Sequence, residues 1–423
     1  MFKRASGTKD ILPQETAQWQ RLEKISHQIF SLYNYHEIRT PLIEEESLFD
    51  RSLGKSTEIV RKQMFLIKKG RDSYCLRPEG TASVVRAYIE NSLDKKSGFI
   101  KLYYIGPMFR AERPQRGRLR QFHHIGCEVI GSGEPEVDIE IIALADNLLS
   151  LFSVKGYRIQ VNSLGCLEDK KKFIDLLRQQ LKPKANKLCD DCRVRFKDNV
   201  LRVLDCKNET CREIIRTLDI QAQVSALGTQ SGHLCLECKD HFERVCKGLD
   251  ALRLDYKVNP YLVRGLDYYT RTVFEVTHPA LGAQDAIGAG GRYDNLVEEL
   301  GGPDTAAMGF AFGMERLILA LDAPAEAQNK ELIFIVSLGE EAKKEALLLL
   351  SQLRKEGLAC DTDYENKSLK GAMRLANDSG AKRILIIGED ELKKEIVTLK
   401  DMRSGGQKEV KRQDLLAELK RGS

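Results

Sequence analysis

The hydrophobic pattern of this chain changes three times along its length, and these changes limit the folds open to it. Short apolar runs that alternate with charged turns fill residues 71–131 and predict strands that pair mostly antiparallel. Residues 165–255 are instead rich in lysine and in helical patterns, and a strand-like pattern returns at 261–263 and 272–276. We therefore expect a mainly helical, cysteine-rich insertion, at about 165–255, within a larger domain of the α+β class.

The third change lies at residues 322–327, a run of alanine, proline and acidic residues that predicts a linker. It is followed by two continuous apolar runs, at 333–336 and 384–387, and by two helical patterns, at 340–355 and 368–379. Continuous apolar runs beside helices are typical of buried parallel strands with crossover helices. We therefore expect a main domain at residues 1–325 and a small α/β domain at residues 331–423.

Composition narrows the class of protein further. The 423 residues are 42% hydrophobic and 30% charged, as in globular proteins, and the net charge of +5 excludes a histone-like polycation. No run approaches the roughly 18 apolar residues of a membrane span, and the start carries no signal-peptide core. We expect a cytoplasmic protein with no membrane partner, whose 11 cysteines are thiols or metal ligands and not a disulfide scaffold.

Arginine is concentrated in one short segment. Five arginines and one acid occupy residues 110–120, where Pro114 and Gly117 indicate a turn between two extended arms. Such a turn brings Arg110 and Arg118 close together, and planar guanidinium groups suit pairs of phosphate oxygens. The pattern favours a phosphate-binding hairpin, and the alternative is a solvated basic hairpin.

A carboxylate and a hydroxyl lie two positions apart in residues 77–81. Glu79 and Thr81 flank a glycine there, and together they can hold an ammonium group. Taken alone, however, the Pro-Glu-Gly sequence fits an ordinary surface turn better than a binding site.

Three other segments place polar groups beside glycines. Residues 309–317 predict an apolar strand that turns at Gly313 into a helix carrying Arg316, a usable contact for a nucleotide. Residues 264–270 and 290–294 combine arginine with tyrosine. Tyrosine hydroxyls near charged groups either line a polar pocket or cap the edge of a sheet.

Six cysteines form three closely spaced pairs in the expected insertion. The pairs are Cys189 with Cys192, Cys206 with Cys211, and Cys235 with Cys238. Two CxxC pairs are a strong metal signature where disulfides are not expected. We expect a structural Zn²⁺ bound by Cys189, Cys192, Cys235 and Cys238. Alternatively, Cys206 and Cys211 replace one of these two CxxC pairs as ligands. The competing interpretation is a set of reduced, partly buried thiols.

The order of all these segments is more specific than any one of them. Together they resemble the histidyl-tRNA synthetases of bacterial type, a family of class II aminoacyl-tRNA synthetases. Residues 39–61, 109–128 and 309–317 resemble the first, second and third class II motifs. Residues 264–269 and 290–294 resemble the two segments peculiar to histidine enzymes. The likeness covers nearly the whole chain, including its last part.

This resemblance implies a class II catalytic domain, with an antiparallel sheet flanked by helices, a helical insertion and a C-terminal α/β anticodon-binding domain. It implies ATP-dependent attachment of L-histidine to tRNA(His) through a histidyl-adenylate, with Mg²⁺ bound alongside ATP. It also implies a homodimer whose interface includes the proline of the first motif, Pro41.

The resemblance assigns five residues to ATP. Arg110 would bind the α-phosphate, and Arg118 and Arg316 would hold the β- and γ-phosphates. Phe122 would stack on adenine, and Glu112 would contact the edge of the base. Positioned cations of this kind supply most of the rate in phosphoryl transfer, because negative charge builds up on the phosphoryl oxygens.

Catalysis and tRNA contact are assigned by the same resemblance. Arg264 resembles the family's catalytic arginine, which together with Arg110 reaches the histidine carboxylate and the α-phosphate. The loop residues Arg113, Gln115 and Arg116 would face the acceptor end of tRNA(His).

Six residues are assigned to histidine. Three would hold its ammonium group and three would read its imidazole: Glu79, Thr81 and His124, then Glu128, Tyr269 and Tyr293. His124 departs from the family's pattern, which has glutamine there, but a neutral imidazole can accept one hydrogen bond in the right tautomer. His123 and His124 as joint metal ligands are the alternative, which is disfavoured because successive strand residues point to opposite faces.

Three other functions compete with this one. A synthetase-like regulatory subunit of histidine biosynthesis typically lacks the C-terminal domain and parts of the catalytic set, whereas this chain has Arg110, Arg264 and Arg316. A class II synthetase for proline, threonine or glycine is disfavoured by the segments around Arg264 and Tyr293. A nucleic-acid-binding module without catalysis is disfavoured by the complete set of pocket residues.

Overall fold

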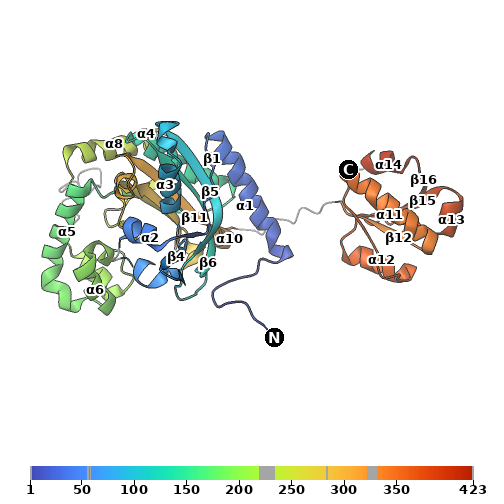
Figure 1. Cartoon of the computed structure of the whole chain (residues 1–423), viewed down its shortest axis with the longest axis horizontal. Helices are drawn as coiled ribbons and strands as arrows, with labels where there is room; N and C mark the ends of the chain where they lie inside the picture. Colours follow the sequence, from blue (N-terminus) through green and yellow to red (C-terminus); the bar gives the residue numbers. More distant parts are fainter. Residues whose placement is uncertain are drawn as a thin grey trace. The chain divides into compact units, whose positions relative to one another are not determined.

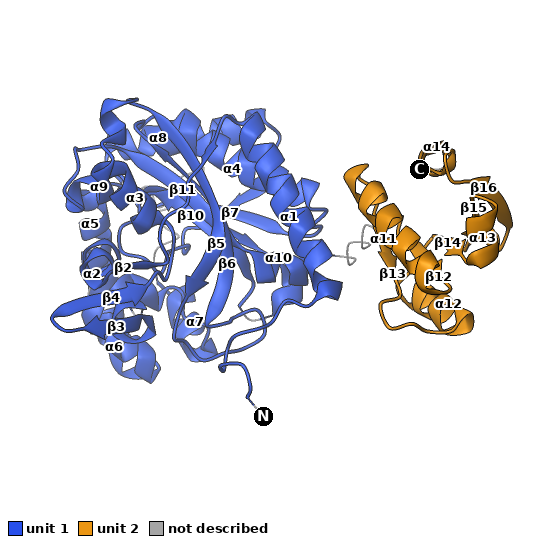
Figure 2. Cartoon of the chain, turned by 45° about the vertical axis from the view of Figure 1, so that its right-hand side comes forward, with its two compact units in different colours: residues 1–325 blue, residues 326–423 orange. Residues whose placement is uncertain are grey.

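The computed structural model describes residues 2–54, 57, 59–218, 234–282, 284–321 and 331–421. The chain divides into two compact units, residues 1–325 and residues 326–423 (Figure 2). The linker expected at 322–327 lies outside the described residues. Among the helices in the described ranges, no segment combines the length and apolar character needed to span a membrane.

The first unit is built on a sheet of eight strands in the order β1-β5-β6-β11-β10-β9-β7-β8. Its central pairs are antiparallel, whereas β1 pairs parallel with β5 and β8 pairs parallel with β7. The strands are β1 (His36–Glu37), β5 (Ile100–Phe109), β6 (Gln121–Ile130), β7 (Arg158–Ser163), β8 (Tyr256–Val258), β9 (Thr270–Thr277), β10 (Ala286–Arg292) and β11 (Ala307–Gly313).

Strand β6 lies between β5 and β11 and is hydrogen-bonded to both. Its register with β11 places His124 opposite Gly313 and Glu128 opposite Gly309. Side chains four positions apart on a strand point to the same face, so His124 and Glu128 face the same side of the sheet.

Helices cover both faces of this sheet (Figure 1). They are α1 (Pro13–Leu32), α2 (Glu46–Leu53), α3 (Thr81–Glu90), α4 (Pro135–Leu151), α5 (Leu167–Leu181), α6 (Asp190–Asp198), α7 (Glu209–Arg216), α8 (Leu236–Ala251), α9 (Leu296–Glu299) and α10 (Met314–Ala320). Both α1 and α4 begin with proline, whose missing N–H costs nothing in a first turn. Buried residues of α1 and α4, among them Leu22, Phe30 and Leu148, pack against the sheet in one apolar cluster.

Helices α5 to α8 belong to the insertion, which lies in sequence between strands β7 and β9. The insertion does not separate those strands in space, because β7 pairs antiparallel with β9 from Arg158↔Thr277 to Ser163↔Thr272. Helices α5, α6 and α7 share an apolar cluster with α2 and α3, which includes Phe173, Leu177 and Val203, whereas α8 packs in the cluster of α1 and α4.

Two local expectations from the sequence were wrong. Helix α3 lies within residues 71–131, where we expected only strands and loops. The apolar run 261–263 is a turn and not a strand, and the strand pattern resumes at β9. Tertiary burial explains the helix, because α3 buries Val84, Val85 and Tyr88, whose intrinsic preference is for strands.

The second unit is a small α/β domain. Its five-stranded sheet has the order β13-β12-β14-β15-β16, in which β12 pairs parallel with β13 and β14, and the other pairs are antiparallel. The elements are β12 (Ile333–Ser337), α11 (Glu340–Lys355), β13 (Cys360–Thr362), α12 (Leu369–Asp378), β14 (Arg383–Ile387), α13 (Glu389–Lys393), β15 (Ile396–Asp401), β16 (Gln407–Lys411) and α14 (Leu415–Arg421). The parallel strands and crossover helices expected from the sequence are present.

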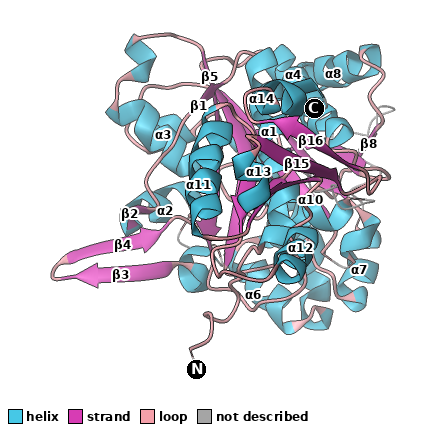
Figure 3. Ribbon diagram, turned by 90° about the vertical axis from the view of Figure 1, so that its right-hand side faces the viewer, coloured by secondary structure: helices cyan, strands magenta, loops and turns pink. Residues whose placement is uncertain are grey.

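A separate three-stranded sheet carries exposed apolar side chains. It has the order β2-β4-β3, with β2 (Ile43–Glu45), β3 (Phe65–Lys69) and β4 (Asp72–Leu76), and the β3–β4 hairpin projects from the rest of the unit (Figure 3). Ile43, Leu66 and Ile67 are 52%, 47% and 39% exposed. By the strand register Ile43 and Ile67 share one face of this sheet and Leu66 lies on the other.

A fully buried ion pair joins β10 to α4. The guanidinium group of Arg292 contacts Asp138 at 2.6 Å and donates to the carbonyls of Ser132 and Glu134. Asp138 also lies 3.2 Å from His241 on α8. Arg292 therefore ties the sheet to two helices instead of lining the pocket.

We predict that Arg292→Ala destabilises the first unit by about 3–5 kcal/mol, because it leaves the buried carboxylate of Asp138 without its cation. Guanidinium unfolding followed by tryptophan fluorescence measures this, since the chain's one tryptophan, Trp19, lies in the first unit. The control is Arg244→Ala, which removes an exposed ion pair from α8 and should leave the midpoint unchanged. Equal midpoints for the two variants would contradict the prediction.

Candidate active site

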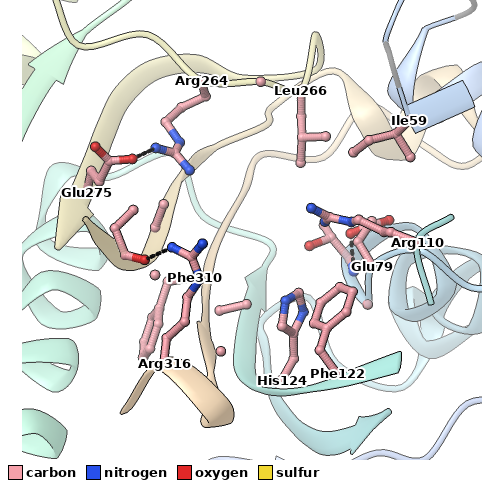
Figure 4. Close-up of a pocket in the computed structure, with 18 of the residues that line it drawn as sticks. Ile59, Glu79, Arg110, Phe122, His124, Arg264, Leu266, Glu275, Phe310 and Arg316 are labelled. Atoms are coloured by element: carbon pink, nitrogen blue, oxygen red, sulfur yellow. Dashed lines mark hydrogen bonds and ion pairs between the residues drawn. The ribbon is translucent and has the colours of Figure 1, made fainter. Parts of the chain in front are cut away.

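A cavity of about 310 Å³ opens on one face of the large sheet. Its lining comes from the β5–β6 hairpin, the start of α3, strand β10, the β11–α10 turn and the segment 263–269 (Figure 4). The elements that the sequence analysis picked out separately therefore meet at one place.

Two arginines of the β5–β6 hairpin, Arg110 and Arg118, line the cavity. Arg110 Nε donates to the carbonyl of Pro78 at 3.0 Å, and the Arg110 guanidinium lies 5.3 Å from the centre of the Phe122 ring. Arg118 Nε lies 3.2 Å from a carboxylate oxygen of Glu112. Burial lowers the pKa of Arg110. The expected hairpin is present, because Arg110 N–H donates to the carbonyl of Arg120.

Arg316 is held by backbone carbonyls instead of a carboxylate. Its Nε donates to Gly117 at 3.0 Å, and its Nη1 donates to Gln284 at 3.1 Å and to Ala286. Carbonyls fix the direction of the side chain but leave its net positive charge uncompensated. Burial lowers the pKa of Arg316. The predicted strand, turn and helix that carry it are confirmed.

Arg264 faces the same cavity from the opposite wall and pairs with Glu275 of β9 (Figure 4). The side chains are 20% and 19% exposed, so water reaches the pair only from the cavity. The Arg264 Nε atom is buried and has no hydrogen-bond partner within the described residues. The Arg264 side chain itself lines the cavity.

The carboxylate of Glu128 is buried and surrounded by hydroxyl groups. It accepts hydrogen bonds from Thr81 at 2.8 Å, from Tyr104 at 3.2 Å and from Tyr293 at 2.6 Å. Burial raises the pKa of Glu128 to about 8, although these hydrogen bonds oppose the rise. A carboxyl group with such a pKa can accept or donate a hydrogen bond near neutral pH.

Glycine at position 309 makes room for that carboxylate. A Cβ built on Gly309 would lie 1.8 Å from Oε2 of Glu128 and 2.4 Å from the carbonyl oxygen of Cys127. Neither neighbour can move away without breaking strand pairing or the hydroxyl cluster. Strand β11 is therefore tied to β6 by a direct steric requirement at Gly309.

Glu79 lies at the N-terminus of α3. Its carboxylate accepts from the backbone N–H groups of Thr81 and Ala82 at 2.7 and 2.9 Å, and burial raises its pKa. Residues 77–81 are buried almost completely, so the surface turn that the sequence alone favoured is wrong.

The adjacent histidines point to opposite faces, as expected. His123 contacts Glu315 at 3.0 Å and stacks edge-on against Trp19, whereas His124 lines the cavity beside Phe122. Burial, reinforced by the charge of Arg110, lowers the pKa of His124 to about 3. Its ring is therefore neutral at physiological pH. Its buried Nδ1 has no partner among the described residues, so it can hydrogen-bond a ligand.

Most of the predicted site residues lie together. The cavity lining includes Arg264 and all five residues assigned to ATP: Arg110, Glu112, Arg118, Phe122 and Arg316. It also includes five of the six residues assigned to histidine: Glu79, Thr81, His124, Tyr269 and Tyr293. Glu128 lies behind the lining and reaches it through Thr81 and Tyr293. Arg113, Gln115 and Arg116 are exposed on the hairpin and do not line the cavity.

Sequence reasoning missed three residues of the site. Glu275 pairs with Arg264, Tyr104 donates to Glu128, and Tyr268 lines the cavity beside Tyr269. Tyr104 lies in an apolar strand pattern that gave no polar signal. The adjacency of Tyr268 to Tyr269 was the only signal for that residue.

The cysteine set expected to bind one Zn²⁺ is divided in the structure. Cys189 and Cys192 meet Cys206 and Cys211, whereas Cys235 and Cys238 meet Cys166 and Asp169. The structure therefore does not bring Cys189, Cys192, Cys235 and Cys238 together, because each CxxC pair lies in a different cluster. The alternative with Cys206 and Cys211 matches the first cluster.

Comparison with known proteins agrees with the geometry. The model of the histidyl-tRNA synthetase family matches residues 7–317, and the anticodon binding domain model matches residues 332–422. A histidine--tRNA ligase of Desulfitobacterium hafniense is 47% identical over 417 residues, which are 98% of this chain and 96% of that protein. One of Natranaerobius thermophilus is 44% identical over 414 residues, 97% of this chain and 96% of the relative.

A solved structure extends the likeness to three dimensions. The crystal structure of apo S. aureus histidyl-tRNA synthetase matches with a TM-score of 0.81 at 34% identity, and the match covers 99% of each chain. The expected fold class, a class II catalytic domain with a C-terminal anticodon-binding domain, is thereby confirmed. The chain therefore belongs to the histidyl-tRNA synthetase family.

Proposed function

We propose that this protein attaches L-histidine to tRNA(His) in two steps, as a class II histidine--tRNA ligase. The observation that carries the proposal is the single cavity that combines cationic side chains with a buried carboxyl and hydroxyl cluster. The cations suit the phosphates of ATP, and the cluster suits the imidazole of histidine. Because charging of tRNA serves translation, we propose a cytoplasmic location.

In the first step, a carboxylate oxygen of histidine attacks the α-phosphorus of ATP, and the bond to pyrophosphate breaks. Arg110 and Arg264 are proposed to stabilise the charge on the α-phosphoryl oxygens, and Arg118 and Arg316 the charge on pyrophosphate. Phe122 would stack on adenine and Glu112 would contact its edge. Mg²⁺ with ATP would add positive charge, and Glu112 and Glu275 are carboxylates in the lining that would hold it.

Histidine would be selected by polar groups at the other end of the cavity. Glu79 and Thr81 are proposed to bind its ammonium group, with the neutral ring of His124 accepting one hydrogen bond. Glu128, Tyr269 and Tyr293 are proposed to read the two imidazole nitrogens, and Glu128 can match either nitrogen because its carboxyl accepts or donates. An amino acid that leaves these buried groups unpaired would be rejected by roughly 10⁴-fold or more.

In the second step, a hydroxyl of the terminal ribose of tRNA(His) attacks the adenylate and AMP leaves. Arg113, Gln115 and Arg116 are exposed beside the cavity, where a phosphate backbone could contact them. The second unit, residues 326–423, is proposed to bind the anticodon of the same tRNA.

A structural Zn²⁺ is proposed in the insertion at Cys189, Cys192, Cys206 and Cys211. The four sulfur atoms lie within 4.8 Å of one another, and four thiolates are a common ligand set for tetrahedral zinc. The Cys189 N–H donates to Cys211 Sγ at 3.3 Å, which is the polarity that stabilises a thiolate.

The chain is proposed to form a homodimer through the β2-β4-β3 sheet, because Ile43 and Ile67 are exposed on one of its faces. We predict that sedimentation equilibrium at micromolar concentration gives a dimer and that Ile67→Asp gives a monomer. Lys68→Ala on the same exposed strand is the control and should remain a dimer. A monomeric wild type would exclude the proposal.

The function is tested by ATP–pyrophosphate exchange with each of the twenty amino acids in turn. We predict that exchange requires histidine, because only an imidazole pairs all the hydrogen-bonding groups around Glu128. A second assay should show histidine transferred to tRNA(His). Exchange with another amino acid, at a rate equal to that with histidine, would overturn the assignment.

We predict that Arg264→Ala slows histidine-dependent exchange by about a hundredfold or more, because it removes a charge that acts mainly in the transition state. The matched control is Arg158→Ala, which removes an exposed arginine at the start of β7. Tryptophan fluorescence and circular dichroism should show that both variants fold. A near wild-type rate in Arg264→Ala would mean that Arg264 is not catalytic.

A further inference from the structure

A second group of metal-binding side chains lies at the base of the insertion, away from the cavity. Cys166, Asp169, Cys235 and Cys238 place three sulfur atoms and a carboxylate oxygen within 4.8 Å of one another. All of these cysteines are free thiols. Three thiolates and one carboxylate have the number and the chemistry of a closed tetrahedral zinc site.

The two clusters are built in the same way. Cys235 is the N-cap of α8 and Cys238 is its third residue, as Cys189 and Cys192 are for α6. The Cys238 N–H donates to Cys235 Sγ at 3.5 Å. Unpaired N–H groups and the positive end of the helix dipole favour thiolates at a helix N-terminus. Each CxxC pair is thereby preorganised to present two sulfur ligands.

Asp169 is oriented toward the cysteines. It is fully buried in the first turn of α5, and both of its oxygens lie 3.0 Å from the backbone N–H of Cys235. The nearest cation is the exposed ammonium group of Lys172, at 3.9 Å. Gly165 has φ of +72°, and a Cβ there would lie 2.8 Å from Oδ2 of Asp169. A buried carboxylate requires compensating charge, which a metal ion supplies.

We propose that Cys166, Asp169, Cys235 and Cys238 bind a second Zn²⁺, distinct from the one proposed at Cys189, which closes the base of the insertion. Its ligands come from both ends of the insertion, since Cys166 directly precedes α5 and the CxxC pair begins α8. One ion therefore fixes the positions of the two helices that enter and leave the insertion.

The same segment holds part of the proposed histidine pocket. Lys170, next to Asp169, donates to the carbonyls of Asp267 and Tyr269 at 2.6 and 3.1 Å. The backbone of Gly165 accepts from Arg271 N–H at 2.7 Å. The second centre thus positions the segment that carries Tyr269. This positioning role rests on the proposed function, whereas the metal site itself does not.

Metal analysis of the full chain, purified without chelator or metal-affinity tag, tests the site. The expected content is two zinc equivalents per chain, falling to one in Cys235→Ser/Cys238→Ser and to one in Cys206→Ser/Cys211→Ser. Cys246→Ser, a buried cysteine of α8 outside both clusters, is the control and should retain two. One equivalent in the wild type would overturn the proposal, even if the variants misfold.

Cobalt substitution distinguishes the ligand sets. Sulfur-to-metal charge-transfer absorption scales with the number of thiolates bound to cobalt, which is four in the first cluster and three in the second. The Cys206/Cys211 variant should therefore lose about four sevenths of this absorption, and the Cys235/Cys238 variant about three sevenths. Asp169→Asn should keep the three thiolates but weaken metal retention against a competing chelator by about 10-fold or more, because loss of an outer-shell partner alone typically costs about 10–100-fold. Disulfides in thiol titration of the unreduced protein, or iron in place of zinc, would also overturn the proposal.

Kinetics test the positioning role. The Cys235/Cys238 variant should raise KM for histidine about tenfold or more, with a smaller effect on KM for ATP, whereas the Cys206/Cys211 variant should change neither. Loss of one zinc equivalent without a change in the histidine KM would remove the positioning role. Absence of histidine-dependent exchange in the wild type would overturn the proposed function and leave the metal count as a separate result.

Discussion

Strand β6 is hydrogen-bonded to β5 on one side and to β11 on the other, and the candidate site depends on this double pairing. Because the backbone register is fixed on both sides, the arginine hairpin, the ring of His124 and the carboxyl of Glu128 occupy set positions along one face. The turn into α10 then delivers Arg316 from β11 to the same cavity. Residues far apart in sequence therefore need no separate positioning device.

Charge inside the cavity is arranged in two regions. Arginines predominate where phosphates would bind, and two kinds of partner orient them: carboxylates for Arg118 and Arg264, and backbone carbonyls for Arg110 and Arg316. The carboxyls of Glu79 and Glu128 lie at the other end, where burial raises the pKa of both. The two regions meet at Arg110, which donates to the carbonyl of Pro78 next to Glu79, so a ligand that joins a phosphate to an ammonium group could bind across this boundary.

The fold class and most pocket residues could be predicted because the segments occur in an order that resembles one family, whereas single patterns predicted only local structure. The strand, glycine turn and helix around Gly313 and the hairpin around Gly117 are examples. Helix α3 could not be predicted, because Val84 and Val85 favour strands and only burial decides for a helix. The partners of the cysteines were also inaccessible: spacing identifies each CxxC pair, but which pairs meet depends on where α6 and α8 begin in space.

The antiparallel pairing of β7 with β9 across the insertion has a consequence for synthesis of the chain. Strand β7 leaves the ribosome about a hundred residues before its partner, so its edge stays unpaired while α5 to α8 are made. Closing so long a loop carries an entropic cost, which helical structure formed early in the insertion would reduce by shortening the free chain. A nascent chain that folds the insertion first would thus bring β9 to β7 with the least delay.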